Sequence, residues 1–245
     1  MTDPASHAFS VVDRDAVYRA ILTRRDVRGQ FRPDVLPPTV LARILTAAHH
    51  APSVGFMQPW DFVVIEDIAI RRAVKASFDK ANARAAENYT GDRRQIYSTL
   101  KLEGILDSPV NICVTCDRSR GGPHVLGRNT VLEADLFSTC LAVENLWLAA
   151  RAEGVGVGWV SILNPTDLAP LLGLPPHVVS VAYLCVGYVT EIHSDPDLRV
   201  AGWRDRLPLD GLIHRDRWGS PHADLTAALP DIESPTLPPS DQPPC

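Results

Sequence analysis

The sequence lacks the features that mark membrane proteins, nucleic-acid-binding proteins and secreted proteins. No apolar run approaches the roughly 20 residues that a membrane-spanning helix requires. Positive charge is in deficit: the formal net charge is −5 at pH 7, whereas nucleic acids and anionic membranes bind to basic surfaces. The first residues, MTDPASHAFSVVDRD, include early acids and no apolar segment of a secretory signal. We therefore expect a cytoplasmic protein that binds neither nucleic acid nor a membrane.

Several common catalytic and nucleotide-binding motifs are also absent. The segment GGPHVLG is rich in glycine, but it has neither the GxxxxGK(S/T) nor the GxGxxG spacing of a phosphate-binding loop. Neither GxSxG nor HExxH occurs, so the sequence contains no motif of a serine hydrolase or a zinc peptidase. Any catalytic chemistry must therefore come from less familiar loops at the ends of helices and strands.

Cysteine is too scarce and too irregularly spaced for a disulfide framework. The chain has five cysteines, an odd number. Cys113 and Cys116 form a CxxC pair, but they lie in PVNICVTCD, a β-branched run that predicts a buried strand. Residues three apart on a strand point to opposite faces, so the two thiol groups diverge. No second CxxC or nearby histidine pair completes a zinc site. We expect these cysteines to pack in the core and predict no metal site.

The length and composition predict a globular protein of one large domain or two small ones. Hydrophobic residues make up 45% of the 245 residues and charged residues 22%, a balance typical of a soluble enzyme with a buried core. Helical and strand patterns follow one another in mixed order, so both kinds of element build the fold. After Trp218 the composition changes, and we expect a tail over residues 220–245. The tail is rich in proline and cannot bury enough apolar surface to order itself, so we predict that it is flexible.

The strongest predicted helix is VLEADLFSTCLAVENLWLAARAEG. It closes at Gly154, and glycine is the residue most suited to the position after a helix C-terminus. The helix is apolar around much of its circumference. We therefore expect it to be central, either buried in the core or placed at a subunit interface.

The segment from Arg24 to Arg28, with the sequence RRDVR, is the first candidate binding site. Clustered guanidinium groups can bind a phosphate in bidentate fashion, and their charge does not titrate away. Taken alone, the segment is more simply explained as a solvated charged turn in which Asp26 pairs with its neighbours. Both interpretations remain open from the residues themselves.

Two further segments carry polar groups on loops or at a strand end. In APSVGFMQPW, Ser53 and Gln58 offer hydroxyl and amide groups on a loop braced by proline, suited to the edge of a planar heterocycle. In GVGWVSI, the glycines allow a ligand to approach the backbone, and Ser161 is predicted to end a buried strand. In isolation, an ordinary helix-to-strand connection with Trp60 in the core explains the first segment better, and a bulged strand with a hydrogen-bonded serine explains the second better.

The order of these three segments around a central helix resembles the flavin-dependent nitroreductase family over about residues 14–219. The resemblance implies one FMN-binding domain over these residues, with an extension over residues 1–13 and the tail over residues 220–245 outside it. That resemblance implies an α+β nitroreductase-like fold, with a mixed central sheet flanked by helices, and an intertwined homodimer that binds FMN at its interface. It also implies that the early arginines hold the ribityl phosphate, that the APS…QPW loop lines the isoalloxazine ring, and that VGWVSI lies near flavin N5. On this basis the residues expected to contact FMN are Arg24, Arg25, Asp26, Val27, Arg28, Ser53, Gly55, Gln58, Lys101, Val160, Ser161 and Arg206.

Within that family, the sequence resembles one branch more closely. Asp26 within RRDVR, the segment KLEGILDSPVNICV, Ser161 within GWVSIL, and AGWRDRLPL all match this branch. The branch uses O₂ to fragment reduced FMN into 5,6-dimethylbenzimidazole, the lower ligand of vitamin B12. The resemblance implies that Asp26 and Ser161 are catalytic and that a separate flavin reductase supplies reduced FMN.

Two other functions remain open at this point. The same fold also serves NAD(P)H-dependent nitro and quinone reductases, and a flavin-binding carrier or sensor would bind FMN without turnover. The chemistry of Asp26 also leaves two roles open. A neighbouring arginine lowers the pKa of an aspartate and weakens it as a base. Asp26 is therefore either a base for cleavage of the ribityl chain or a group that holds the cofactor in place.

Overall fold

The computed structural model describes residues 7–230, and these divide into two units. The larger unit comprises residues 24–203, and the smaller one comprises the described residues up to 23 and from 204 onward. Residues 231–245, most of the tail for which we predict flexibility, lie outside the described range. Within residues 7–230, no helix combines the length and the apolar character needed to cross a membrane.

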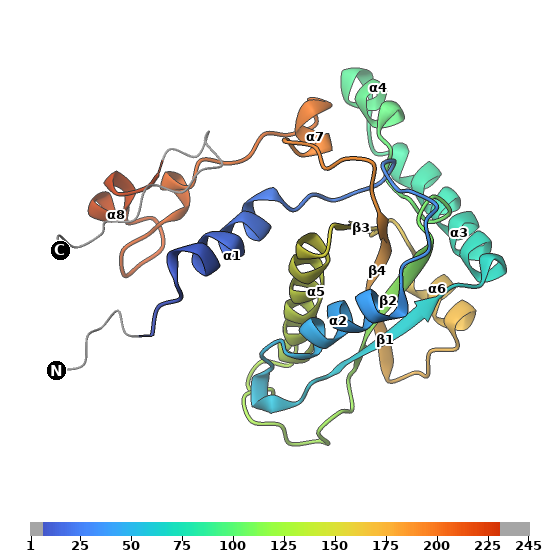
Figure 1. Cartoon of the computed structure of the whole chain (residues 1–245), viewed down its shortest axis with the longest axis horizontal. Coiled ribbons are helices and arrows are strands. Elements are labelled where there is room, and N and C mark those ends of the chain that lie inside the picture. Colours follow the sequence, from blue (N-terminus) through green and yellow to red (C-terminus); the bar gives the residue numbers. More distant parts are fainter. Residues whose placement is uncertain (1–6, 231–245) are drawn as a thin grey trace. The chain divides into compact units, whose positions relative to one another are not determined.

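A four-stranded sheet forms the centre of the larger unit (Figure 1). Its strands, in spatial order, are β1 (Trp60–Ile65), β2 (Val110–Asp117), β4 (Val178–Tyr188) and β3 (Val155–Trp159). Each neighbouring pair is antiparallel. The mixed sheet expected from the sequence is therefore antiparallel throughout its named strands, and the parallel component is one isolated bridge between Asp26 and Val157.

Helices cover both faces of this sheet, which confirms the α+β class. In the larger unit they are α2 (Pro38–His49), α3 (Ile68–Ala86), α4 (Gly91–Thr99), α5 (Ala134–Ala152), α6 (Pro165–Leu172) and α7 (Asp197–Val200), with a short 3₁₀ turn η1 (Val54–Phe56). The smaller unit contains α1 (Val11–Thr23), a 3₁₀ turn η2 (Asp210–Leu212) and α8 (Ala223–Ala227).

Each face of the sheet carries its own apolar cluster. On one face, Ile44 of α2 and Leu146 of α5 pack in one cluster with alternate strand residues such as Ile112 of β2. On the other face, α3 and α6 contribute to a cluster that includes Cys113. The Cys116 side chain is instead hydrogen-bonded to Thr139 of α5. The two thiol groups therefore lie on opposite faces, as the strand periodicity predicts. Burial raises the pKa of the Cys113 thiol to about 12, so it stays protonated at neutral pH.

Helix α5 is the central helix that the sequence predicts, and it contacts α2 and strands β2, β3 and β4. It ends at Ala152, and Gly154 follows with a φ of +72°, the left-handed conformation that favours glycine. Its inward side is buried, but Phe137 and Leu141 on the same helix remain 58% and 46% exposed. Part of its apolar surface is thus left uncovered by the larger unit of one chain.

Candidate active site

The backbone of residues 26–27 lies directly beside strand β3. Asp26 bridges Val157 in parallel fashion, and the Val27 N–H donates to the Val157 carbonyl oxygen at 2.9 Å. A Cβ atom on Gly158 would lie only 1.9 Å from the Val27 carbonyl oxygen. Glycine at position 158 therefore permits this close approach, and the RRDVR segment is brought against GVGW by long-range backbone pairing.

The Asp26 carboxyl group is held by groups from two segments. Its Oδ1 accepts the Trp159 N–H at 2.8 Å, its Oδ2 pairs with the Arg28 guanidinium, and its side chain is 32% exposed. Burial is the largest influence and raises the pKa of Asp26, and the carboxylate of Asp197 acts in the same direction. Arg28 and the Trp159 N–H oppose them, but the pKa remains above its ordinary value. The neighbouring arginine lowers this pKa as expected, but desolvation outweighs the ion pair and makes the net shift upward.

Arg24 and Arg25 are anchored on α5 and on a distant loop. The Arg24 Nε donates to Glu144 Oε1 at 3.2 Å, and its guanidinium lies 5.6 Å from the centre of the Trp147 ring. The Trp147 Nε1 donates in turn to the Arg25 carbonyl oxygen at 3.1 Å. Arg25 itself donates to the backbone carbonyl oxygens of Arg24 and Ser194. These contacts fix the start of the segment before it reaches β3.

Arg28 and Lys101 form the other flank of the segment. Arg28 is buried, and its Nε has no hydrogen-bond partner within residues 7–230. A Cβ atom on Gly29 would lie 3.9 Å from Cγ of Lys101, so the two segments are in contact. The Lys101 Nζ pairs with Asp107 at 2.7 Å and with Glu103 at 3.3 Å. Burial alone would lower the pKa of Lys101, but the two carboxylates raise it overall.

Val160 and Ser161 lie directly after the end of β3 and are not part of the strand. The predicted strand through Ser161 is shorter in the structure, because β3 ends at Trp159. Val160 is buried and its N–H donates to the Tyr183 carbonyl oxygen at 2.8 Å, whereas Ser161 is exposed. Because Asp26 is hydrogen-bonded to Trp159, both expected catalytic residues lie at the same end of β3.

The loop with Ser53, Gly55 and Gln58 is ordered by internal contacts and by α5. Ser53 Oγ accepts the Gln58 N–H at 3.0 Å. The N–H of Val54 donates to Ser138 Oγ of α5 at 3.1 Å. Gly55 has a φ of +59°, and a Cβ atom there would lie 2.7 Å from the Leu126 carbonyl oxygen. The loop is therefore a tight turn that only glycine permits at position 55.

The structure does not bring all the predicted residues into one cavity of one chain. The loop contacts α5 at Ser138, whereas Arg24 contacts it at Glu144, six residues further on. Six residues correspond to about 9 Å along a helix, so the two groups occupy different levels of α5. Arg206 lies in the smaller unit and is exposed.

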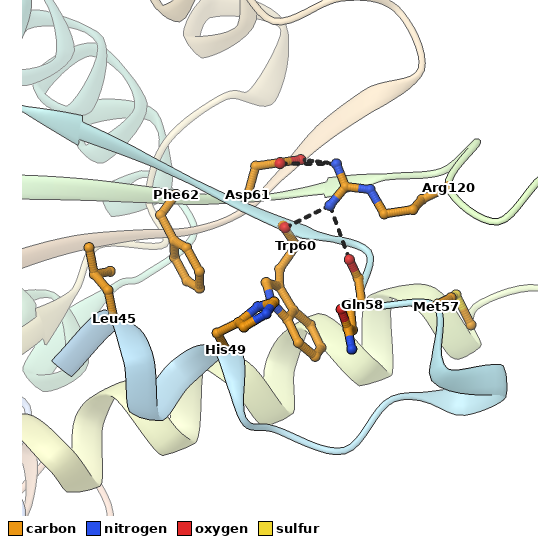
Figure 2. A pocket seen from close by; sticks show the side chains of 8 residues that line it. All are labelled: Leu45, His49, Met57, Gln58, Trp60, Asp61, Phe62 and Arg120. Carbon is orange, nitrogen blue, oxygen red and sulfur yellow. Dashed lines mark hydrogen bonds and ion pairs between the residues drawn. The ribbon is translucent and has the colours of Figure 1, made fainter. Parts of the chain in front are cut away.

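A separate cavity of about 480 Å³ lies between α2 and β1 (Figure 2). Arg120 closes one side, donating to the Gln58 and Trp60 carbonyl oxygens at 3.0 and 2.9 Å and pairing with Asp61 at 2.8 Å. The Trp60 Nε1 donates to His49 Nδ1 at 3.2 Å. Of the predicted site residues, Gln58 alone is among the eight that line this cavity, so it is distinct from the Asp26 site.

Sequence reasoning missed three groups around Asp26: Gln30, which is near it in the chain, and His193 and Asp197, which follow β4. Gln30, His193 and Asp197 line a small cavity together with Asp26. The histidine and the acid occur in EIHSDPD, a polar segment without a recognisable motif. No local pattern could have found them, because they are separated from Asp26 by about 170 residues and meet it through the fold alone.

The chain belongs to the nitroreductase family, whose model matches residues 21–188. Three relatives named 5,6-dimethylbenzimidazole synthase are 36–42% identical to it. The one from Rhodospirillum rubrum is 42% identical over 195 residues, which cover 80% of this chain and 92% of that protein. One from Rhodobacter capsulatus is 39% identical over 202 residues, which cover 82% of this chain and 97% of that protein.

More distant relatives share the fold with other activities. A protein named NADH dehydrogenase from Thermus thermophilus is 30% identical over 198 residues, which cover 76% of this chain and 94% of that protein. Among solved structures, iodotyrosine deiodinase bound to FMN and 3-iodo-L-tyrosine aligns with a TM-score of 0.63 and 22% identity, covering 82% of this chain and 98% of that chain. This similarity confirms the nitroreductase-like fold.

Proposed function

We propose that the protein is an oxidoreductase that fragments reduced FMN with O₂ and forms 5,6-dimethylbenzimidazole, the lower ligand of vitamin B12. The position of Asp26 carries the proposal: a carboxyl group with a raised pKa lies at the end of β3, beside the residues that lead to Ser161. The relatives named 5,6-dimethylbenzimidazole synthase support the same activity.

The residues around Asp26 fit a ligand that carries a phosphate. The buried Nε of Arg28 is a donor without an acceptor in the described part of the chain, and such a donor is costly unless a ligand satisfies it. Arg24, which pairs with Glu144, and Lys101, which pairs with Glu103 and Asp107, place further cationic groups on either side of Arg28. We assign Arg24, Arg25 and Arg28, with the backbone of Val27, to the phosphate and ribityl chain of FMN.

The remaining predicted contacts would orient the flavin ring and its substituents. We assign Ser53, Gly55 and Gln58 to the ring edge, the backbone of Val160 and the hydroxyl of Ser161 to the region of N5, and Lys101 and Arg206 to the periphery. Reduced FMN supplies the electrons that O₂ accepts and the dimethylbenzene ring that is retained in the product.

Two residues of the chain would handle protons. Asp26, with its raised pKa, is a stronger base than an ordinary aspartate and is suited to remove a proton from a ribityl hydroxyl group. Ser161 is exposed at the end of β3 and is suited to donate or accept one hydrogen bond near N5. The Trp159 N–H and Arg28 hold the Asp26 carboxyl in one orientation.

We also propose that the working form is a homodimer with the flavin bound between subunits. Within one chain, the arginine segment and the 53–58 loop contact α5 at levels about 9 Å apart along the helix. The resemblance to the nitroreductase family implies a contact between subunits at the flavin site. The exposed Phe137 and Leu141 on α5 offer apolar surface for that contact, and α1 buries none of its own side chains. Light scattering at micromolar concentration should show a dimer, and an FMN-loaded monomer would contradict the shared site.

The product of reduced FMN in air distinguishes this function from its alternatives. We expect the purified protein to consume reduced FMN, supplied by a separate flavin reductase or a chemical reductant, and to release a benzimidazole that contains the dimethylbenzene ring. Chromatography with mass spectrometry measures both compounds. Survival of FMN while NAD(P)H and a nitro or quinone acceptor are consumed would instead show a reductase, the second candidate, which the similarity to the Thermus thermophilus NADH dehydrogenase favours. FMN binding without either reaction would show a carrier.

A further inference from the structure

A small cavity joins Asp26 to the segment that follows β4. Its volume is about 10 Å³, which is close to the minimum needed for one water molecule. The polar side chains that line it are Arg25, Asp26, Gln30, Glu191, His193 and Asp197. Two acids and a histidine from residues 191–197 are therefore placed next to the proposed base.

His193 and Asp197 form a close pair within this cluster. The His193 Nδ1 and the Asp197 Oδ1 are 2.6 Å apart, and the His193 Nε2 lies 3.3 Å from Glu191 Oε1. The hydrogen bond to Asp197 is the largest influence and raises the pKa of His193 above its ordinary value; burial opposes it, and the Glu191 carboxylate acts with Asp197. His193 therefore loses its proton at a higher pH than an ordinary histidine.

Gln30 connects this pair to the backbone beside Asp26. Its Nε2 donates to Asp197 Oδ2 at 3.4 Å, and its Oε1 accepts the N–H groups of Arg28 and Gly29 at 3.1 and 3.2 Å. Asp197 is thus tied to the same short segment that carries Asp26 and Arg28. The hydrogen bonds of Gln30 therefore help to fix the Asp197 carboxylate relative to Asp26.

The other charged and titratable groups around Asp26 are few. Arg28 pairs with it directly, and Arg25 lines the same cavity. The charge of Asp26 acts on Cys185 of β4 as well. Burial raises the pKa of the Cys185 thiol to about 12, so the thiol remains neutral. Glu191 lines the cavity too and pairs with His193, whereas Asp197 is the acid that raises the pKa of Asp26. His193 therefore sets how much of the negative charge of Asp197 is offset.

We propose that His193 and Asp197 are positioning residues that act on the reaction through Asp26, so that protonation of His193 controls how tightly Asp26 holds a proton. This inference rests on the proposed function only in taking Asp26 as the proton acceptor. When His193 is charged, it offsets the negative charge of Asp197. When His193 loses its proton, the full charge of Asp197 faces Asp26 and makes Asp26 the stronger base.

The sign of this coupling predicts opposite effects for two substitutions. The ordinary pKa of an aspartate lies well below that of a histidine, so we take His193 as charged where Asp26 titrates. His193→Gln removes a positive charge and should move the titration midpoint of Asp26 to higher pH, whereas Asp197→Asn removes a negative charge and should move it to lower pH. We expect each displacement to be about 0.5 pH unit or more, because the groups are partly exposed and screened. His193→Lys keeps the positive charge and should leave the midpoint near that of the wild type.

The midpoint can be measured without relying on product formation. Full-length protein labelled with ¹³C at aspartate Cγ gives a carboxyl resonance for each aspartate, and Asp26→Asn identifies the signal of Asp26. Asp195→Asn is the matched control, because Asp195 lies on the same segment but pairs with Arg199 and is not among the residues lining the cavity. It should leave the midpoint unchanged. The His193 resonances should also titrate at lower pH in Asp197→Asn, which checks the pair itself.

Product formation provides a second readout. In the wild type its rate should rise as the pH increases through the pKa of His193, and this rise should be absent in both His193→Gln and His193→Lys. Displacements of the Asp26 midpoint in one direction for both charge-removing variants, or within about 0.2 pH unit of wild type, would overturn the inference. If one variant fails to fold, the Asp26 midpoint of the other variant is compared with that of the wild type, and the direction of its displacement still tests the inference. Displaced midpoints in a protein that forms no benzimidazole would refute the proposed function and leave the charge coupling intact.

Discussion

Asp26→Asn is expected to slow benzimidazole formation from reduced FMN by about 10²–10⁴-fold, the usual contribution of a positioned base. The amide has the shape of the carboxyl group and can still accept the Trp159 N–H through Oδ1, but it cannot take up a proton. Arg24 and Arg28 remain in place, so FMN should still bind. Chromatography of the products measures the rate, and flavin fluorescence measures the binding.

The chain offers a matched control for this substitution. Asp34 also pairs with an arginine two residues away, Arg32, at 2.9 Å, but on the exposed surface. Asp34→Asn should therefore leave the rate unchanged. Ser161→Ala should reduce the rate without loss of FMN, with the exposed Ser98→Ala as its control. A twofold decrease in either site variant would reduce that residue to a packing role, and loss of FMN would make it a binding residue.

Replacing Arg24 or Arg28 by alanine is expected to weaken FMN binding far more than riboflavin binding. A charge-assisted hydrogen bond contributes about 1.5–3 kcal/mol, which corresponds to an increase in Kd of roughly 10- to 150-fold. Riboflavin lacks the phosphate and should bind with nearly unchanged affinity. Quenching of flavin fluorescence measures both dissociation constants under the same ionic strength.

Arg43→Ala is the control for the loss of one surface arginine. Arg43 forms a bidentate pair with Glu153 at 2.7 Å, as Arg24 pairs with Glu144, but it lies on α2 and outside the arginine segment. It should affect neither flavin. Equal weakening of FMN and riboflavin by the Arg24 and Arg28 variants would remove the phosphate assignment. A similar loss in Arg43→Ala would point to net charge as the cause.

Features with a local cause were predictable from the sequence. The apolar periodicity of α5 and the glycine that follows it define a helix whatever surrounds them. The alternation of strand β2 likewise placed Cys113 and Cys116 on opposite faces. The family could be inferred for a related reason, since RRDVR, APSVGFMQPW and GWVSI are continuous segments whose order is visible in one dimension.

Features that depend on desolvation or on distant segments were not predictable. From the sequence, the arginines beside Asp26 imply a lowered pKa, and burial reverses the direction. Strand β3 ends at Trp159, and the Val160 N–H makes one further bond to Tyr183 of β4, so Ser161 lies just beyond the paired segment. The expected mixed sheet is antiparallel throughout its named strands, because strand direction is decided by pairing between segments far apart in the chain.

The sequence by itself determined the residue types at the proposed site, the helices and strands that carry them, and membership of the nitroreductase family. The tertiary structure alone decided that Asp26 lies against β3, that Gly158 makes room for this contact, and that His193 and Asp197 face the same cavity. The physical reason is the range of the interactions. Periodicity and turn preferences act over a few residues, whereas electrostatic environment depends on which groups exclude water and which charges meet after folding.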